Sequence, residues 1–365
     1  KKTKKDIKIS DHPILDNFFK ASKDFNFNFN KQLNSSSEDQ VGHYNVNIYK
    51  GLRNSSAKSF LKPIQNNPNL TILKNTEVLK LNFKDNKISS LEIKHKSKIL
   101  KIKPKIGTIL SSGSIMTPYL LLKSGIGNAN DLKQLSIPVS FHSPHVGKNF
   151  QDHLGLDYLY KTHLPTLNRD LGTWPGRIQS FLRYVYNRKG PLSLSLNQGG
   201  GYINWKSLDP YPNIQLYFNP LTYSVTFKDK RPLLNTDKFN GFIIGFNSCR
   251  PKSLGEINLK VSGDDYLPSI DPKYLSDEKD IHDLYSIFDF IRKFAANKNI
   301  NDIIKSPVNI DPINSSDFEL LDHFKSNATS IYHPCGTWRM SKGVETGVVS
   351  EKLKVHGLDN LWIVD

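Results

Sequence analysis

The sequence predicts a mixed α/β fold in two domains, and three patterns carry that prediction. A strand, a small-residue turn and a helix follow one another over residues 106–127, as in the βα units of a dinucleotide-binding sheet. Alternating apolar and polar residues over 214–218 and 257–261 predict strands of a mostly antiparallel sheet. Apolar residues at helical spacing over 277–296 predict a helix that covers one face of that sheet. A chain of 365 residues is long enough for two such domains.

The positive net charge of the chain suggests two classes of partner to test, nucleic acids and membrane surfaces. The formal net charge is +16, and strongly basic proteins attract polyanions. The lysines are scattered, however: only residues 1–5 form a run, and we recognise no basic helix interleaved with aromatic residues. No apolar run is long enough to cross a bilayer. We therefore predict a solvated basic surface that attracts acidic partners weakly, no nucleic-acid partner and no transmembrane segment.

Cysteine content and processing signals leave the localisation open. Cys249 and Cys335 are too few for a disulfide framework or a zinc site, so we expect two buried thiols, with one bridge as the alternative. We recognise no signal peptide. The sequence starts with lysine and ends inside a strand pattern at Asp365, which we interpret as a fragment cut at both ends; secretion stays open. The Asn-x-Ser/Thr sequons are about as frequent as chance allows; they lie at Asn34, Asn54, Asn69, Asn314 and Asn327.

Smaller elements are predicted along the rest of the chain. Residues 14–25 and 57–61 have the apolar spacing of short helices, and the polar stretch 26–40 is typical of a loop. Alternation over residues 71–103 predicts a β-meander of three strands. The three glycines at 199–201 are interpreted as a flexible turn. Because no Gly-Lys-Ser/Thr follows them, they do not form a phosphate loop.

The βα unit at residues 106–127 is the first candidate for a site. Its strand is followed by the small residues of positions 111–114. Thr117 is the predicted N-cap, Pro118 the first helical residue, and Gly125 the residue that ends the helix. Ligands of such sheets bind at the carboxyl ends of the strands, where small residues let them approach. An ordinary βα connection is the alternative.

Two further stretches carry residues that can do chemistry. In the loop 146–153, the pair Asp152 and His153 could be catalytic or bind a metal, but no further ligands lie at metal spacing. We therefore predict that Asn149, Asp152 and His153 form a hydrogen-bonded structural loop without a metal. Near the end of the chain, His333 lies next to a proline and before a glycine turn, where a fixed imidazole could move a proton near neutral pH. A structural histidine in a turn is the alternative.

Four stretches together resemble the glucose–methanol–choline (GMC) flavoprotein oxidoreductases. Residues 113–127, GSIMTPYLLLKSGIG, resemble the second signature of that family. Residues 146–153 resemble its VGxNLxDH loop, with phenylalanine in place of leucine. Residues 333–340 resemble its HPxGTCRM stretch, with Trp338 in place of cysteine. Residues 347–365 resemble its closing GVVD…LRVxGVxNLRVVD segment. The matches cover most of the chain in family order, and their texture is closest to insect and mite glucose dehydrogenase-like members.

The resemblance implies a fold and an activity. The fold would be a partial FAD-binding Rossmann-like domain and a substrate domain with an antiparallel sheet and covering helices. Residues 1–160 would be the remainder of the FAD-binding domain with some substrate-domain elements, 161–325 the substrate-binding domain, and 326–365 a return to the FAD-binding domain. The activity would be oxidation of the CH–OH group of an alcohol or sugar to a carbonyl, with FAD as cofactor and oxygen or a quinone as the undetermined electron acceptor.

The resemblance also implies roles for individual residues. His333 stands in the place of the base that removes the hydroxyl proton while the hydride goes to the flavin N5. Val78 matches a position whose backbone meets the adenine. Gly113, followed by Ser114, matches the glycine where the FAD domain closely approaches its cofactor. Asp365 matches the aspartate that opens a turn against the flavin.

The sequence departs from the family pattern at its two ends. The first glycine-rich fingerprint should precede residue 1, and the histidine or asparagine partner of His333 should follow Asp365; neither is in this sequence. We therefore expect the full-length protein to be an enzyme and this fragment alone to be inactive. Two other interpretations stay open: an FAD-containing lyase without net redox chemistry, and a catalytically silent paralogue that binds or stores a ligand.

Overall fold

The computed structural model describes residues 12–33, 38–207, 209–228 and 231–365. The basic run at residues 1–5 and the sequon at Asn34 lie outside the described residues. The fold is mixed α/β, as the sequence predicts. The chain divides into two compact units, each built from three segments and described by itself below. Unit 1 comprises Lys1–Asn67, Leu154–Arg250 and Ile281–Ser330, and unit 2 comprises Pro68–His153, Pro251–Asp280 and Ile331–Asp365.

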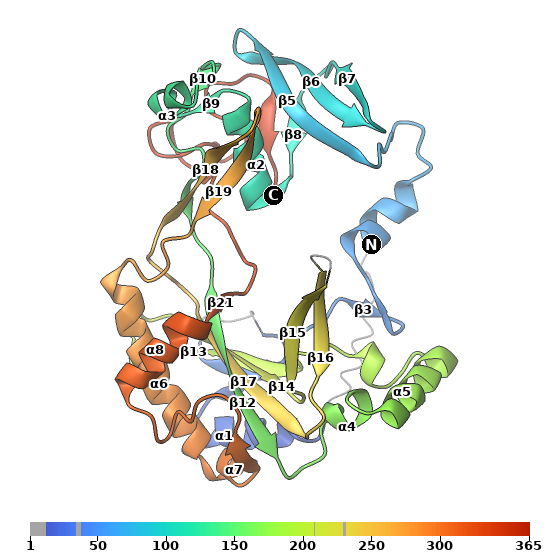
Figure 1. The fold of residues 1–365 in the computed structure, drawn as a ribbon, viewed down its shortest axis with the longest axis vertical. Helices are drawn as coiled ribbons and strands as arrows, with labels where there is room; N and C mark the ends of the chain where they lie inside the picture. Colours follow the sequence, from blue (N-terminus) through green and yellow to red (C-terminus); the bar gives the residue numbers. More distant parts are fainter. Residues whose placement is uncertain (1–11, 34–37, 208, 229–230) are drawn as a thin grey trace. The chain divides into compact units, whose positions relative to one another are not determined.

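A large sheet forms the centre of unit 1 (Figure 1). Its order is β1-β2-β13-β14-β17-β12-β20, and β21 also pairs with β12. All pairings are antiparallel except that of β1 with β2, so the predicted mostly antiparallel sheet is confirmed. The strands are β1 (Asn28–Phe29), β2 (Gln40–His43), β12 (Leu154–Thr162), β13 (Gly199–Ile203), β14 (Ile214–Asn219), β17 (Gly241–Ser248), β20 (Ile304–Pro307) and β21 (Thr329–Ser330).

The three glycines of residues 199–201 belong to β13, so their interpretation as a flexible turn is wrong. β13 pairs with β2 on one side and β14 on the other. A β-carbon on Gly200 would lie 2.1 Å from the Leu216 carbonyl oxygen, and one on Gly201 would lie 2.3 Å from the Gln40 carbonyl oxygen. Glycine is needed here because neighbouring strands approach too closely for a side chain.

Helices bury aromatic side chains against this sheet. The helices are α1 (Leu15–Asp24), α6 (Glu278–Ala296), α7 (Lys298–Asn301) and α8 (Asp317–Asn327). The ring centroid of Phe18 on α1 lies 5.4 Å from that of Phe218 on β14 and 5.6 Å from that of Phe294 on α6. Phe324 on α8 stacks on Phe246 of β17 at 6.0 Å. The predicted covering helix is confirmed, since α6 begins one residue later than expected and buries its apolar stripe.

The remaining elements of unit 1 are short, apart from one helix that the sequence did not predict. They are β3 (Ile48–Tyr49), β4 (Leu52–Arg53), η1 (Ala57–Leu61), η2 (Lys62–Ile64), α4 (Leu167–Leu171), α5 (Trp174–Asn187), η3 (Pro191–Ser193), β15 (Tyr223–Lys228) and β16 (Arg231–Thr236). Pro175 and Gly176 resemble helix breakers in the sequence, yet they lie in the first turn of α5. The Thr173 hydroxyl accepts a hydrogen bond from the Gly176 N–H and caps the helix, and proline is well tolerated in a first turn.

Unit 2 contains the predicted meander and the predicted βα unit. The meander is β5 (Thr76–Lys84), β6 (Lys87–His95) and β7 (Lys98–Ile102), all antiparallel. β8 (Thr108–Leu110) pairs in parallel with β22 (Leu361–Ile363), and α2 (Gly113–Lys123) follows β8. The smaller elements are β9 (Ile126–Gly127), α3 (Ala129–Gln134) and β10 (Phe141–His142).

The strand predicted at 257–261 belongs to unit 2 and not to the large sheet. It is β18 (Gly255–Ser262), which lies between β11 (Lys148–Phe150) and β19 (Asp265–Asp271). Its alternation correctly indicates one buried face, since Ile257 and Leu259 are buried. Period-two alternation does not say which strands pair, however. The core of unit 2 joins Leu259 to Leu81, Leu121 and Leu361 from three other elements.

Candidate active site

The βα unit of residues 106–127 begins its helix earlier than predicted. α2 starts at Gly113, so Thr117 and Pro118 lie inside it. Pro118 has no N–H, and the carbonyl of Ser114 therefore loses its usual donor within the helix. The Thr337 hydroxyl donates to this carbonyl at 2.6 Å. Thr117 still serves the helix start, since its hydroxyl accepts a hydrogen bond from the Ser112 N–H at 3.1 Å.

Gly113 lies at the carboxyl ends of two parallel strands. Its φ is +82°, and no heavy atom lies within 4 Å of a β-carbon built on it. The Gly113 N–H donates to the Asp365 carboxylate, and the Ser111 hydroxyl donates to the Val364 carbonyl at 2.6 Å. The ends of β8 and β22 are thus tied together beside free space. Backbone without a side chain at such a strand end fits the close approach of a dinucleotide.

The segment that carries His333 is hydrogen-bonded to the first turn of α2. The Ser114 hydroxyl donates to the Pro334 carbonyl, while Thr337 bonds the carbonyl of the same serine. On its other side the segment pairs with the loop 147–151: the Cys335 N–H donates to the Gln151 carbonyl at 2.8 Å, and the Cys335 carbonyl accepts from the Gln151 N–H at 3.0 Å. The backbone that follows His333 is therefore held from both sides.

The turn at Gly336 closes this pairing. Its φ is +90°, and a β-carbon there would lie 2.0 Å from the Asn149 carbonyl oxygen. Tyr332, directly before the histidine, has φ +62°, which non-glycine residues rarely adopt. The backbone on either side of His333 is thus held in left-handed geometry, a feature that is concentrated at functional sites.

A buried carboxylate fixes the backbone of two histidines. The Asp152 side chain, in a residue only 6% exposed, accepts hydrogen bonds at Oδ1 from the backbone N–H groups of His153 and His333, both at 2.9 Å. Its Oδ2 accepts from the Tyr274 hydroxyl at 2.8 Å. The two imidazole centroids lie 5.8 Å apart. Asp152 therefore fixes the position of the His333 backbone, from which the imidazole extends.

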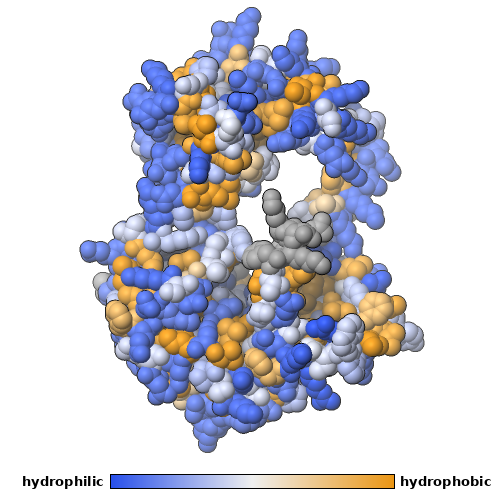
Figure 2. Space-filling model, viewed as in Figure 1, coloured by the Kyte–Doolittle hydropathy of each residue, from blue (hydrophilic) through white to orange (hydrophobic). Residues whose placement is uncertain are grey.

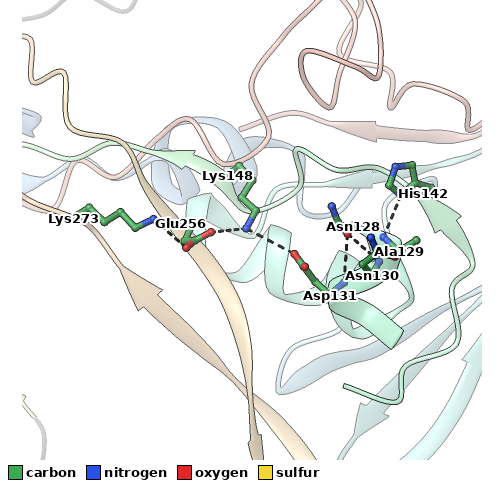
Figure 3. Close-up of polar contacts among 8 residues, drawn as sticks. All are labelled: Asn128, Ala129, Asn130, Asp131, His142, Lys148, Glu256 and Lys273. Atoms are coloured by element: carbon green, nitrogen blue, oxygen red, sulfur yellow. Dashed lines mark hydrogen bonds and ion pairs between the residues drawn. The ribbon is translucent and has the colours of Figure 1, made fainter. Parts of the chain in front are cut away.

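An ion cluster anchors the strand that leads to Asp152 (Figure 3). Lys148 on β11 donates to Glu256 on β18, and Lys273 donates to the other carboxylate oxygen at 3.2 Å. The hydrogen bond from Lys148 is the main reason why the pKa of Glu256 falls to about 2. Lys148 also lies 3.9 Å from the carboxylate of Asp131 at the start of α3, and the Asn128 side chain caps that helix. We assign this cluster a structural role.

All five predicted site residues belong to unit 2, where four of them lie near the start of α2 and Val78 lies on β5. Gly113 is hydrogen-bonded to Asp365, and the neighbouring Ser114 is hydrogen-bonded to Pro334, the residue after His333. Val78 is on β5, opposite Ile93, with 37% of its surface exposed. β5 meets α2 at the opposite end of that helix, where the Leu81 N–H donates to the Ser124 hydroxyl at 2.9 Å.

Other predictions for site residues have mixed outcomes. In the part of the chain that the structure describes, no three or more His, Cys, Asp or Glu side chains gather as metal ligands; that Asn149, Asp152 and His153 bind no metal stays a prediction. Both cysteines are free, but Cys335 is exposed and Cys249 half-buried. The expectation of two buried thiols is therefore wrong. No helix among the described residues is long and apolar enough to cross a membrane.

Sequence reasoning missed the contacts that hold His333 in place. Tyr274 lies 122 residues from Asp152, and Thr337 lies 223 residues from Ser114. A tyrosine or threonine at such a distance gives no local signal. The one available clue was Pro118, which removes a helical donor and so requires a substitute for it.

Comparison with known proteins identifies the family. Models of the GMC oxidoreductases match residues 4–155 and 251–365. An "Alcohol dehydrogenase [acceptor]" of Pseudomonas putida is 32% identical over 357 residues, covering 97% of this chain and 63% of the relative. Mitochondrial choline dehydrogenase of Mus musculus is 28% identical over 363 residues, covering 98% of this chain and 59% of the relative. The chain thus spans about three fifths of these relatives.

Solved structures agree in fold. A formate oxidase superimposes with a TM-score of 0.86 at 24% identity, covering 97% of this chain and 65% of that one. A pyridoxine 4-oxidase superimposes with a TM-score of 0.80 at 23% identity, covering 97% and 64%. The family models define the class, oxidoreductases. Within that class, the chain belongs to the GMC oxidoreductase family. The narrower resemblance to insect and mite members stays a prediction.

Proposed function

We propose that the complete protein oxidises a CH–OH group of a small-molecule alcohol or sugar to a carbonyl, with FAD as cofactor and His333 as the general base. The observation that carries this proposal is the pair of hydrogen bonds by which Ser114 joins the His333 segment to the first turn of α2. They support the proposal because they join the segment that carries His333 to the helix turn that begins at the open glycine, Gly113. The relatives named for alcohol and choline oxidation support an alcohol as the substrate class.

In this proposal, one set of residues contacts the cofactor and His333 acts on the substrate. Bound FAD would supply the hydride acceptor. Gly113 would let it approach the strand ends, with Ser114 and Asp365 beside it and Val78 against its adenine. The space around Gly113 and its positive φ fit such a ligand. In its neutral form, the exposed His333 imidazole would take the hydroxyl proton and hold it as the carbonyl forms.

We propose matching roles for the two units. Unit 2 contains the βα unit and His333, so it would bind FAD and bring the base. Unit 1 contains the large antiparallel sheet, so it would form the substrate domain. The proposal keeps one FAD-binding and one substrate-binding domain, as expected from the sequence. It assigns each segment to the unit in which it packs, so residues 12–33 and 38–67 go with the sheet of unit 1.

A flavin-bleaching assay on the full-length protein tests the proposal. We expect a panel of primary alcohols and sugars, added without oxygen, to include a substrate that abolishes the oxidised flavin absorbance. Admitting oxygen or adding a quinone would then show which acceptor restores it. Cyanohydrin cleavage without bleaching would instead indicate a lyase. A bound flavin that no substrate bleaches, without cleavage, would indicate a silent binding protein; either result contradicts the proposal.

A further inference from the structure

Helix α5 is oriented with its polar side toward the protein. Ser180 is buried. Gly176 lies so close to the preceding helix that a β-carbon on it would be 2.6 Å from the carbonyl oxygens of Arg169 and Asp170. The Tyr184 hydroxyl donates to the Gly51 carbonyl at 2.9 Å. The contacts that attach α5 to unit 1 therefore come from small and polar positions four residues apart, which form one face of a helix.

The opposite side of α5 is an apolar stripe that faces outward. A surface helix normally turns such a stripe toward the core. Here every stripe residue is more than half exposed, from 55% at Ile178 to 75% at Trp174. Figure 2 shows hydrophobic side chains gathered where Figure 1 labels α5. The stripe consists of Trp174, Ile178, Phe181, Leu182 and Val185.

The charged residues of α5 and of the segment that follows it are all basic. Arg177, Arg183, Arg188 and Lys189 are all exposed, and no aspartate or glutamate occurs between residues 171 and 208. The Arg177 guanidinium lies 5.9 Å from the Trp174 ring centroid. α5 is therefore a basic helix interleaved with aromatic residues, a pattern that we did not recognise in the sequence. The sequence interpretation rested on the scattered lysines, whereas the basic residues of α5 are arginines.

From this arrangement we propose that α5 docks the protein on the surface of an anionic lipid bilayer. The stripe would enter the boundary between headgroups and acyl chains, and the arginines would meet the anionic headgroups, as in interfacial amphipathic helices. Branched aliphatic side chains such as Ile178 and Val185 suit acyl chains better than nucleic-acid bases, which stack on aromatic or planar groups. An isologous pairing with a second copy would bring the arginines of both copies together, and the segment 172–207 has no acidic residue to compensate them. This proposal is independent of the oxidoreductase proposal.

The first experiment measures vesicle binding by the full-length protein. Vesicles of phosphatidylcholine and phosphatidylglycerol in equal parts are compared with phosphatidylcholine alone by co-sedimentation. We expect binding to the anionic vesicles only, and weaker binding at high salt, because the charge attraction is screened. The emission of Trp174 should shift to the blue on binding. The shift should vanish in Trp174→Phe.

Two sets of variants test the stripe and the charge separately. The triple variant Ile178→Ser, Phe181→Ser, Val185→Ser should lower the partition coefficient between vesicles and water at least about tenfold. Each of the three substitutions reduces the apolar area that the bound helix buries in the bilayer. Arg183→Gln with Arg188→Gln should reduce the preference for phosphatidylglycerol by about tenfold. Since these side chains are exposed, the thermal unfolding temperature should stay near that of the wild type.

The matched controls change exposed residues that lie outside α5. Phe318→Ser removes a phenylalanine that is 79% exposed on α8, and Lys98→Gln with Lys101→Gln removes two exposed charges on β7; neither should change binding. Absence of vesicle binding by the full-length protein, or equal binding by the stripe variant, would overturn the proposal. So would a wild-type dimer that the stripe variant converts to a monomer without any lipid binding, because a second copy would then cover α5.

Discussion

Two glycines of the candidate site share a backbone conformation but differ in what surrounds them. Gly113 and Gly336 have φ values of +82° and +90°. Beside Gly113 there is free space, whereas a side chain at Gly336 would strike the Asn149 carbonyl at 2.0 Å. The packing of the chain itself thus requires a glycine at Gly336, whereas no contact within the chain excludes a side chain at Gly113, where we propose that the cofactor approaches. A sequence signature treats both alike, and only the surroundings separate a ligand-facing turn from a supporting one.

The largest effect on folding should come from Gly336→Ala. The substitution forces a left-handed conformation and a backbone clash, so the free energy of unfolding should fall by about 3 kcal/mol or more. Chemical denaturation of the full-length protein measures it. Gly263→Ala is the control, because Gly263 also has a positive φ, +61°, but free space around it; it should cost only about 1–2 kcal/mol. Equal losses in the two variants would show that the close contact at Gly336 is unimportant.

Gly113→Val should separate cofactor binding from folding. A β-carbon at this position meets no heavy atom within 4 Å, so we expect the fold to lose only the conformational term of about 1–2 kcal/mol. The protein should nevertheless purify with little FAD, measured as the ratio of flavin to protein absorbance. Gly263→Val provides the same backbone strain at another place and should retain its flavin. Normal flavin content in the Gly113 variant would contradict the proposed role.

Part of the fold and of the candidate site could be predicted from the sequence alone. The meander, the long helix α6 and the large sheet follow from periodicity, because apolar spacing reports which face is buried. The βα unit and His333 were found from local motifs. The start of α2 was missed because Ser114 receives its substitute donor from Thr337, 223 residues away. The partner strands of β18 and the outward stripe of α5 were missed for a similar reason: periodicity identifies an apolar face but not what covers it.

Asp152→Ala should reduce catalysis without removing FAD. It deletes the acceptor of the His333 backbone N–H, and a displacement of the imidazole by about 1 Å can lower the rate up to about 100-fold. We expect a roughly 10- to 100-fold lower rate of flavin reduction per bound FAD, with substrate affinity changed less. Tyr274→Phe keeps both backbone bonds of Asp152 and should change the rate less than about threefold. A rate unchanged in Asp152→Ala would show that the carboxylate does not position the base.

Glu256 should contribute a small, pH-dependent part of the stability. Its pKa in the folded protein is about 2, lowered from 4.5 mainly by the hydrogen bond from Lys148. A lowered folded-state pKa stabilises the protein above the unfolded pKa, and this contribution is lost as the pH falls from 4.5 toward 2. The stability difference between wild type and Glu256→Gln, about 1 kcal/mol or less for a pair near the surface, should shrink over that range. A difference independent of pH would rule out this contribution.

The central claim is that His333 takes the proton of the substrate. In the full-length enzyme, stopped-flow measurement of anaerobic flavin reduction, expressed per bound flavin, tests it most directly. His333→Ala should lower this rate by roughly two to four orders of magnitude, with FAD content nearly unchanged. His282→Ala, which removes an exposed imidazole on α6, should reduce flavin at the wild-type rate. A near-normal rate per flavin in His333→Ala would contradict the account.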